Sequence, residues 1–238
     1  MPSIKALKHD RTQEVANEAV HWTQSHRNAI IATAAGALIV AAIIIGVYTY
    51  MQNQDRAAST ALGHAMQVLQ SPVRQPGQPA DPNQPSFANA QERDKAALGE
   101  FEGVAGKFPR TDAGHYSLFM AGVVQLDSGD IAAAEKSFTR TRNDGSSDVS
   151  SLAKLALANI YVGQKRDADA IKIYKDLMDH PTNSVPKVTP ELELAQYYES
   201  HNQKADAVKL YDQMQKENAK SPIGQLAQSK ITELEAGK

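Results

Sequence analysis

The strongest apolar pattern in the chain is one uncharged stretch from Ala29 to Tyr48, which reads AIIATAAGALIVAAIIIGVY. It contains no Asp, Glu, Lys, Arg, His, Asn, Gln or Pro. A helix of this length, rising about 1.5 Å per residue, spans roughly 30 Å, which is the thickness of the hydrocarbon core of a bilayer. The stretch has no polar face, whereas a core helix of a soluble domain normally shows one. The pattern therefore predicts a single transmembrane helix over 29–48.

A cleaved secretory signal is the alternative to a retained anchor. Such signals have an apolar core of about 7–15 residues, followed by a small-x-small cleavage site. Here the apolar core is longer, and the segment TYMQN directly after it offers no such site. We therefore interpret residues 29–48 as a retained anchor in contact with the lipid bilayer.

The charges around the span predict its orientation. The basic residues near it are Lys5, Lys8, Arg11 and Arg27 on one side, and Arg56 on the other. Lys and Arg concentrate on the cytoplasmic side of membrane proteins. We therefore expect a cytoplasmic head at 1–28 and a domain outside the cytoplasm at 49–238.

An alanine followed four residues later by an aromatic residue recurs through this outer domain. The pairs are Ala97 and Phe101, Ala134 and Phe138, Ala170 and Tyr174, and Ala207 and Tyr211. Their aromatic residues are 37, 36 and 37 residues apart. The small residues that stand twelve positions before the last three alanines are Gly122, Ala158 and Ala195. Apolar residues at helical spacing on both sides of short polar turns predict helical hairpins, which must stack to bury their faces.

These residues resemble the tetratricopeptide repeat. In one unit, Leu157, Ala158 and Tyr161 match its first helix, and Ala170 with Tyr174 matches its second. The resemblance implies an all-α fold, in which a single N-terminal transmembrane helix is followed by a tetratricopeptide-like helical-hairpin solenoid. The period of 36–37 residues exceeds the usual value of about 34, and Gln125 replaces the first-helix Tyr of one unit. A generic helical bundle with chance periodicity is the alternative.

The first unit carries an insertion. Leu62 and Gly63 fit a first helix over about 56–70, but Ala97 follows Gly63 by 34 residues instead of twelve. The sequence SPVRQPGQPADPNQP marks a Pro-rich insert at 71–87 within the outer domain. We expect an extended, mobile loop that packs against nothing, with a polyproline ligand for a partner as the alternative. Apolar positions from Pro222 to Glu235 predict a C-terminal capping helix.

Composition and charge exclude several classes of function. The chain of 238 residues has a net charge of −2, and its outer domain carries 21 Lys and Arg against 24 Asp and Glu. Because nucleic-acid binding usually needs a basic face, we expect no nucleic-acid partner. The absence of cysteine excludes disulfides, thiolate catalysis and Cys-ligated zinc. No common catalytic or calcium-loop motif is present, and the seven histidines are scattered. We expect no enzymatic activity, no catalytic residue, no metal site and no cofactor.

Solenoids of this kind usually bind partners with their inner surface. The repeat register predicts which first-helix side chains face it, and many of them are apolar. They are Tyr116, Phe119, Val123, Leu155, Asn159, Leu192, Gln196 and Glu199. One interpretation is a groove for extended or unfolded hydrophobic segments. The other is that these side chains only pack against neighbouring helices.

The layout of the whole chain is similar to a more specific family. A short head with Trp22 and Asn28, one span, an Ala-rich helix from Arg56 and degenerate repeats resemble bacterial inner-membrane proteins described as ancillary subunits of the Sec translocon. The resemblance implies a single-pass inner-membrane protein with a periplasmic domain and an adaptor or chaperone-like role. The implied partners are translocon subunits, periplasmic chaperones and unfolded exported proteins. An envelope scaffold for outer-membrane assembly or cell division, an enzyme and a cytoplasmic adaptor are the alternatives.

Overall fold

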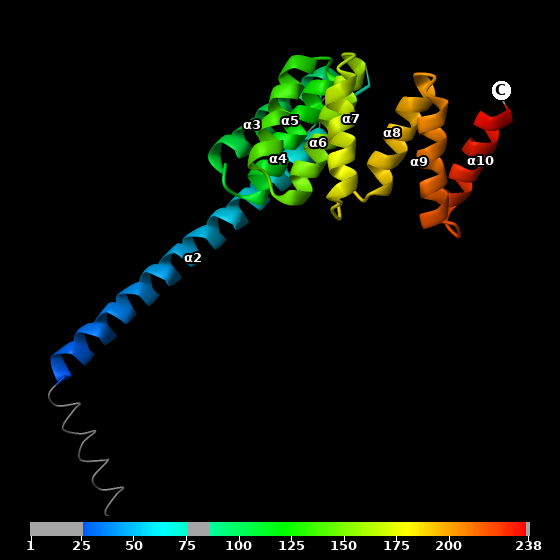
Figure 1. Ribbon diagram of the computed structural model, residues 1–238. Helices are drawn as coiled ribbons and strands as arrows, with labels where there is room; N and C mark the ends of the chain where they lie inside the picture. Colours follow the sequence, from blue (N-terminus) through cyan, green and yellow to red (C-terminus); the bar gives the residue numbers. More distant parts are fainter. Residues whose placement is uncertain (1–25, 76–85, 237–238) are drawn as a thin grey trace, which may run out of the picture. The chain divides into compact units, whose positions relative to one another are not determined.

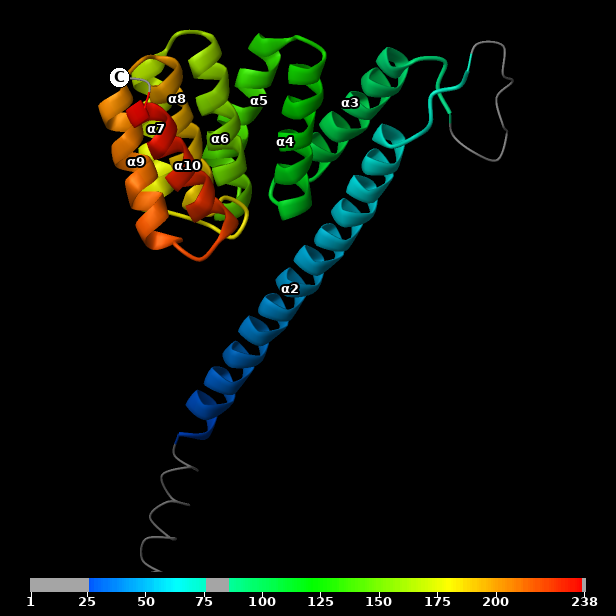
Figure 2. The ribbon, with the colours of Figure 1, turned by 90° about the vertical axis from the view of Figure 1, so that its right-hand side faces the viewer.

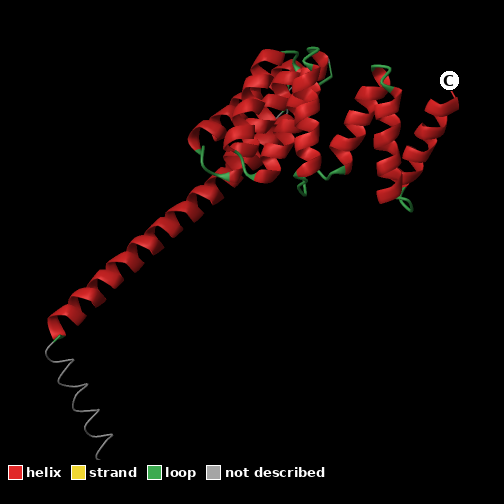
Figure 3. Ribbon diagram, in the orientation of Figure 1, coloured by secondary structure: helices red, strands yellow, loops and turns green. Residues whose placement is uncertain are grey.

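The computed structural model describes residues 26–75 and 86–236, and the chain forms two units, Met1–Asn53 and Gln54–Lys238. Within the described residues the long regular elements are all α-helices, as Figure 3 shows. The all-α prediction is therefore confirmed. Most of the head predicted at 1–28, and the middle of the insert predicted at 71–87, lie outside the described residues.

Helix α2, Arg27–Leu69, contains the predicted span (Figure 1). In the part that belongs to the first unit its large apolar side chains, such as Leu38 and Ile44, are exposed. Thr33 and Thr49 donate their hydroxyl hydrogens to backbone carbonyls one turn back at 3.0 Å, so these polar groups are satisfied within the helix. By its length and composition, α2 is a candidate membrane span.

The second unit begins with residues 54–69 of α2, so the first helix expected at about 56–70 is the end of α2. Helices α3 to α10 follow, and each packs against the next in chain order (Figure 2). They are α3 Ala90–Lys107, α4 Asp112–Asp127, α5 Ile131–Asp144, α6 Ser147–Gly163, α7 Asp167–Asp179, α8 Val188–Ser200, α9 Lys204–Glu217 and α10 Pro222–Ala236. The last of these is the expected capping helix.

Three turns between the two helices of a hairpin share one backbone conformation. Gly129, Lys165 and Asn202 stand at equivalent places and have positive φ angles of 82°, 59° and 58°. In each turn, the N–H of the following residue bonds to a carbonyl five residues back, at 2.8 or 2.9 Å. A left-handed residue with this bond is a standard way to close a helix C-terminus. The repeated turn therefore starts each second helix in the same register.

The alanine–aromatic pairs form the core of the second unit. Each alanine of the four pairs is fully buried, and each aromatic partner is at most 2% exposed. Gly122 shows why first helices need small residues, because a Cβ there would lie 2.7 Å from the ring of Phe138. The pattern in the sequence is thus the packing rule of the structure, and the prediction of a tetratricopeptide-like solenoid is confirmed.

The ends of the Pro-rich insert are paired, which corrects the expectation that it packs against nothing. Val73 and Phe87 form an isolated parallel bridge. The N–H of Arg74 donates to the carbonyl of Phe87 at 2.9 Å, and the N–H of Phe87 donates to the carbonyl of Pro72 at 3.1 Å. Buried Ser71 donates its hydroxyl to a carbonyl of α2 at 2.9 Å. Backbone N–H and C=O groups next to a packed helix end need hydrogen-bond partners. The Pro-rich composition of the insert does not reveal this requirement.

Candidate protein-binding surfaces

The residues predicted to bind partners lie on α4, α6 and α8, the first helices of three hairpins. We call this set the first-helix surface, and it comprises Tyr116, Phe119, Val123, Leu155, Asn159, Leu192, Gln196 and Glu199. Phe119, Leu155 and Leu192 occupy equivalent positions and are all partly buried. One turn later on each helix, Val123 is partly buried, whereas its two polar counterparts are exposed.

The apolar members of the first-helix surface are held by the core. The ring centroid of Phe119 lies 5.5 Å from that of Phe138 and 5.9 Å from that of Tyr116. Phe119, Val123 and Leu155 pack against the cluster that contains Phe138, and none of the three is fully buried. These side chains therefore pack against neighbouring helices and also present an apolar edge to the outside.

Two polar members of the surface accept hydrogen bonds from core tyrosines. The hydroxyl of Tyr174 donates to Asn159 Oδ1 at 2.5 Å, and that of Tyr211 donates to Glu199 Oε2 at 3.0 Å. Lys230 Nζ donates to the other oxygen of Glu199 at 2.9 Å and holds the pKa of this carboxyl below its usual value. Burial raises the pKa of Tyr211 to about 12. Asn159 and Glu199 thus satisfy tyrosine hydroxyls at the edge of the core, a structural role that sequence reasoning did not assign.

Two apolar residues of the same surface were missed. Leu126 and Val162 occupy the positions equivalent to Glu199 and pack, partly buried, against the same core cluster. The register that predicted Glu199 would have identified both. Gln196 is exposed, and its side chain forms no hydrogen bond within the described part of the chain. The first-helix surface is therefore apolar on α4, combines Leu155 and Val162 with exposed Asn159 on α6, and is more polar on α8.

Residues 21–184 match the sequence profile of the tetratricopeptide repeat-like domain family. The chain belongs to this family. The match includes the predicted span and the helices up to α7, and it ends before α8. No curated protein and no solved structure matches the chain. Tetratricopeptide repeat-like domains are typically non-catalytic modules for protein–protein interaction.

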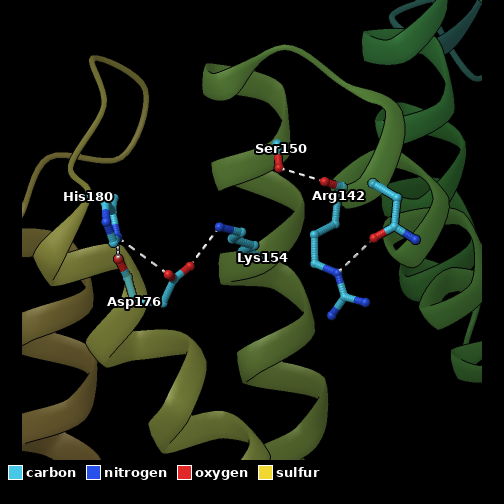
Figure 4. A network of polar contacts seen from close by, with 6 residues as sticks. Arg142, Ser150, Lys154, Asp176 and His180 are labelled. Atoms are coloured by element: carbon cyan, nitrogen blue, oxygen red, sulfur yellow. Dashed lines mark hydrogen bonds and ion pairs between the residues drawn. The ribbon is translucent and has the colours of Figure 1, made fainter.

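The tetratricopeptide repeat-like domain also has a cleft of about 860 Å³ between the start of α6 and the α7–α8 connection. Lys154 of α6 lies next to Asp176 of α7 (Figure 4). Lys154 Nζ is 2.6 Å from Asp176 Oδ2, and His180 Nδ1 is 3.4 Å from Asp176 Oδ1. The hydrogen bond from Lys154 lowers the pKa of Asp176. Lys187, on another wall, pairs with Glu217 at 2.7 Å. Both lysines thus have carboxylate partners, and Asp148 also lines the cleft, so the cleft offers an anionic ligand no unpaired lysine.

Glu191 of α8 is 1% exposed, and neither of its carboxyl oxygens has a hydrogen-bond partner. Burial raises the pKa of this carboxyl above its usual value. The charge of Lys187 acts in the opposite direction, and the charge of Glu217 raises the pKa further. Lys187 itself donates to Glu217 rather than to Glu191. The equivalent residue two repeats earlier is Leu118, which suits a buried position. Glu191 therefore destabilises the fold when it is ionised. Among the described residues, no group of three or more His, Asp or Glu could hold a metal ion.

Proposed function

We propose that the protein is a membrane-anchored adaptor with a chaperone-like role, which binds segments of exported proteins close to the Sec translocon. Three findings support this proposal. The domain belongs to a family of protein-interaction modules. Helix α2 carries a stretch that is long and apolar enough to cross a membrane. The basic residues before that stretch favour a domain on the far side from the cytoplasm.

The observation that carries the proposal is the apolar edge on α4 and α6. Phe119, Val123 and Leu155 lie on neighbouring first helices, are fixed by the core beneath them and are only partly buried. Covering an apolar surface with an apolar side chain is favourable. Because the side chains of this surface are already fixed, they lose little conformational entropy on binding. Extended segments of unfolded proteins offer such side chains. Because these segments must be ordered on binding, we expect an affinity in the micromolar range, about −8 kcal/mol.

A pair of substitutions tests this surface. Phe119→Ser with Leu155→Ser should weaken the binding of a denatured exported protein to the full-length protein by about tenfold or more, as measured by fluorescence anisotropy. Lys172→Ser is the matched control, because Lys172 is exposed on α7, a second helix. A folded double variant that binds as tightly as the wild type would contradict the proposal.

Phe119 also packs against Phe138, so the double variant can lose stability. A second measurement avoids this problem. A photo-crosslinking residue at exposed Gln196, whose side chain has no internal hydrogen bond, should capture the denatured protein, and one at Lys172 should not. Equal capture at both positions would mean that the first-helix surface has no special role.

The proposed orientation has its own test. A reporter that is active only outside the cytoplasm, fused after Lys238, should be active in cells. Activity of a cytoplasm-only reporter at the same place would place the domain in the cytoplasm and exclude a role with exported segments there.

A further inference from the structure

The hairpin formed by α4 and α5 departs from the next two at one pair of positions. Where those hairpins have Tyr161 with Ile173, and Tyr198 with Leu210, this one has Gln125 with Ser137. Gln125 and Ser137 are each 8% exposed. The hydroxyl of Ser137 donates to Gln125 Oε1 at 2.8 Å, and Gln125 Nε2 donates to Glu102 Oε1 at 3.3 Å. A hydrogen-bonded polar pair thus replaces two apolar residues.

A cavity of about 380 Å³ lies over this polar pair, between α3, α4 and α5. Its α3 wall includes Ala105 and Gly106, and its α5 wall includes Ala133, so small residues leave the space open. Gln125 and Ser137 lack the aromatic ring and the branched side chain that their counterparts bring. The cavity therefore lies where these smaller polar side chains replace the larger residues of the next two hairpins. Two of the helices around it, α3 and α5, are second helices, so it is separate from the first-helix surface.

Two cations border the cavity without a counter-ion. Lys136 and Arg140 lie one turn apart on α5, line the cavity, and form no ion pair within the described part of the chain. Like charges at this spacing are slightly destabilising in a helix. By contrast, Lys154 and Arg166 both have carboxylate partners. Glu102 is the acidic residue among those that line the cavity, so its lining has an excess positive charge of one.

We propose that this cavity binds a carboxylate of a partner protein, which goes beyond the proposed role of the first-helix surface. An Arg guanidinium matches a carboxylate with two parallel hydrogen bonds, and a nearby Lys adds a point charge. The second N–H of the Gln125 amide is held in place by the bond from Ser137 and offers a further donor. The volume suits one side chain or a chain terminus rather than a large ligand. The carboxylate comes from an Asp or Glu side chain or from a C-terminus.

Three short fluorescent peptides test the proposal against the full-length protein in detergent. The first has Asp and Glu side chains and an amidated C-terminus, the second is neutral with a free C-terminus, and the third is neutral and amidated. We expect the first or the second to bind in an anisotropy titration and the third not to bind. Whichever of the first two binds identifies the source of the carboxylate.

Substitutions then locate the site. Lys136→Gln with Arg140→Gln should reduce the affinity for the bound peptide by about tenfold, because charge-assisted contacts are lost. Gln125→Tyr with Ser137→Ile restores the residues of the next repeat, fills the cavity and should abolish binding. Glu102→Gln removes the negative charge of the lining and should strengthen binding by a few-fold.

Lys172→Gln with Lys209→Gln is the matched control. Both residues are exposed, occupy the positions equivalent to Lys136 in the next two repeats, and together carry the same charge as the tested pair. This control should bind as the wild type does. An equal loss in the control would reduce the effect to general electrostatics and overturn the proposal. Unchanged binding by Lys136→Gln with Arg140→Gln would also overturn it, and these exposed substitutions leave the core intact. Binding of inorganic phosphate, with none of the three peptides bound, would indicate a phosphate site instead.

Discussion

The two units of the molecule place the same kinds of side chain in opposite surroundings. In the first unit Leu38 is 72% exposed and Ile44 is 62% exposed. In the second unit Leu157 is fully buried, and Leu177 and Leu194 are each 1% exposed. Burying one such side chain contributes about 1.5–3 kcal/mol. The second unit gains this free energy from neighbouring helices, whereas the first unit has no protein neighbour within its own described residues.

This difference fits a candidate membrane span in the first unit and a water-exposed fold in the second. A row of exposed Ile, Leu and Val would make a water-soluble helix associate or aggregate. In lipid the same helix satisfies its backbone hydrogen bonds internally and leaves its side chains among apolar chains. The second unit has the reverse design, because its second helices keep Lys and Asp outside and its alanine–aromatic pairs inside. The predictions below test each half of this contrast.

The largest effect is expected in the core of the second unit. Tyr174→Ala removes a ring that is 2% exposed and the hydrogen bond to Asn159, so it should destabilise the unit by about 3–5 kcal/mol. Thermal unfolding of the full-length protein in detergent, followed by circular dichroism, measures this loss. Tyr174→Phe is the control, because it keeps the ring and should lose only about 0.5–1.5 kcal/mol. An unchanged midpoint for Tyr174→Ala would remove Tyr174 from the core.

The next effect belongs to the first unit. Leu38→Asp should raise the free energy of membrane insertion by about 2.5–3.5 kcal/mol, because a carboxylate at the centre of a span is poorly solvated. Quantitative fractionation of cells should therefore show part of the protein outside the membrane fraction, whereas Leu38→Ala should stay within it. If this helix were exposed to water instead, Asp would be harmless there, and the two variants would fractionate alike.

The contrast between the two units could be predicted largely from the sequence, because a compositional pattern marks the first unit and a periodic pattern marks the second. The span at 29–48 and the alanine–aromatic pairs each repeat one simple rule. Single contacts between distant residues could not be read in this way. Asn159 and Glu199 were predicted as binding residues, but they also accept hydrogen bonds from Tyr174 and Tyr211. The repeat register predicts on which face of a helix a residue lies. Whether a neighbouring side chain forms a hydrogen bond with that residue depends on the geometry of the individual side chains.

Glu191 is the exception to the rule that charges in the second unit lie outside. Burial raises the pKa of this carboxyl in the folded state, so folding favours its protonated form. Its contribution to stability is therefore fully present below the pKa of the unfolded chain, about 4.3, and is lost as the pH rises through the raised folded value. The native protein should consequently carry a local penalty at neutral pH.

Glu191→Gln tests this penalty. The variant should be more stable than the wild type at pH 7 by about 1.4 kcal/mol or more, because Gln keeps a polar group at this buried position but removes the charge that burial disfavours. The gain should shrink toward acidic pH, where the wild-type carboxyl is protonated. Exposed Glu235 provides the control, because Glu235→Gln should change little at either pH. A gain from Glu191→Gln that is independent of pH would mean that ionisation of Glu191 is not its cause.

The smallest effect is expected at the Pro-rich insert, where the middle of the insert can be compared with its paired ends. Replacing residues 76–85 with Gly and Ser at equal length keeps the pairing of Val73 with Phe87 and should shift the unfolding free energy by only about 0.5 kcal/mol. Deleting residues 72–85 instead removes both hydrogen bonds to Phe87 and should cost about 1–3 kcal/mol, with about 0.5–1.5 for each bond. Thermal unfolding of the two variants side by side measures the difference. Equal midpoints would mean that the paired ends of the insert contribute nothing to the stability of the second unit. A large loss for the Gly and Ser replacement would show that side chains within 76–85 contribute to the stability of the fold.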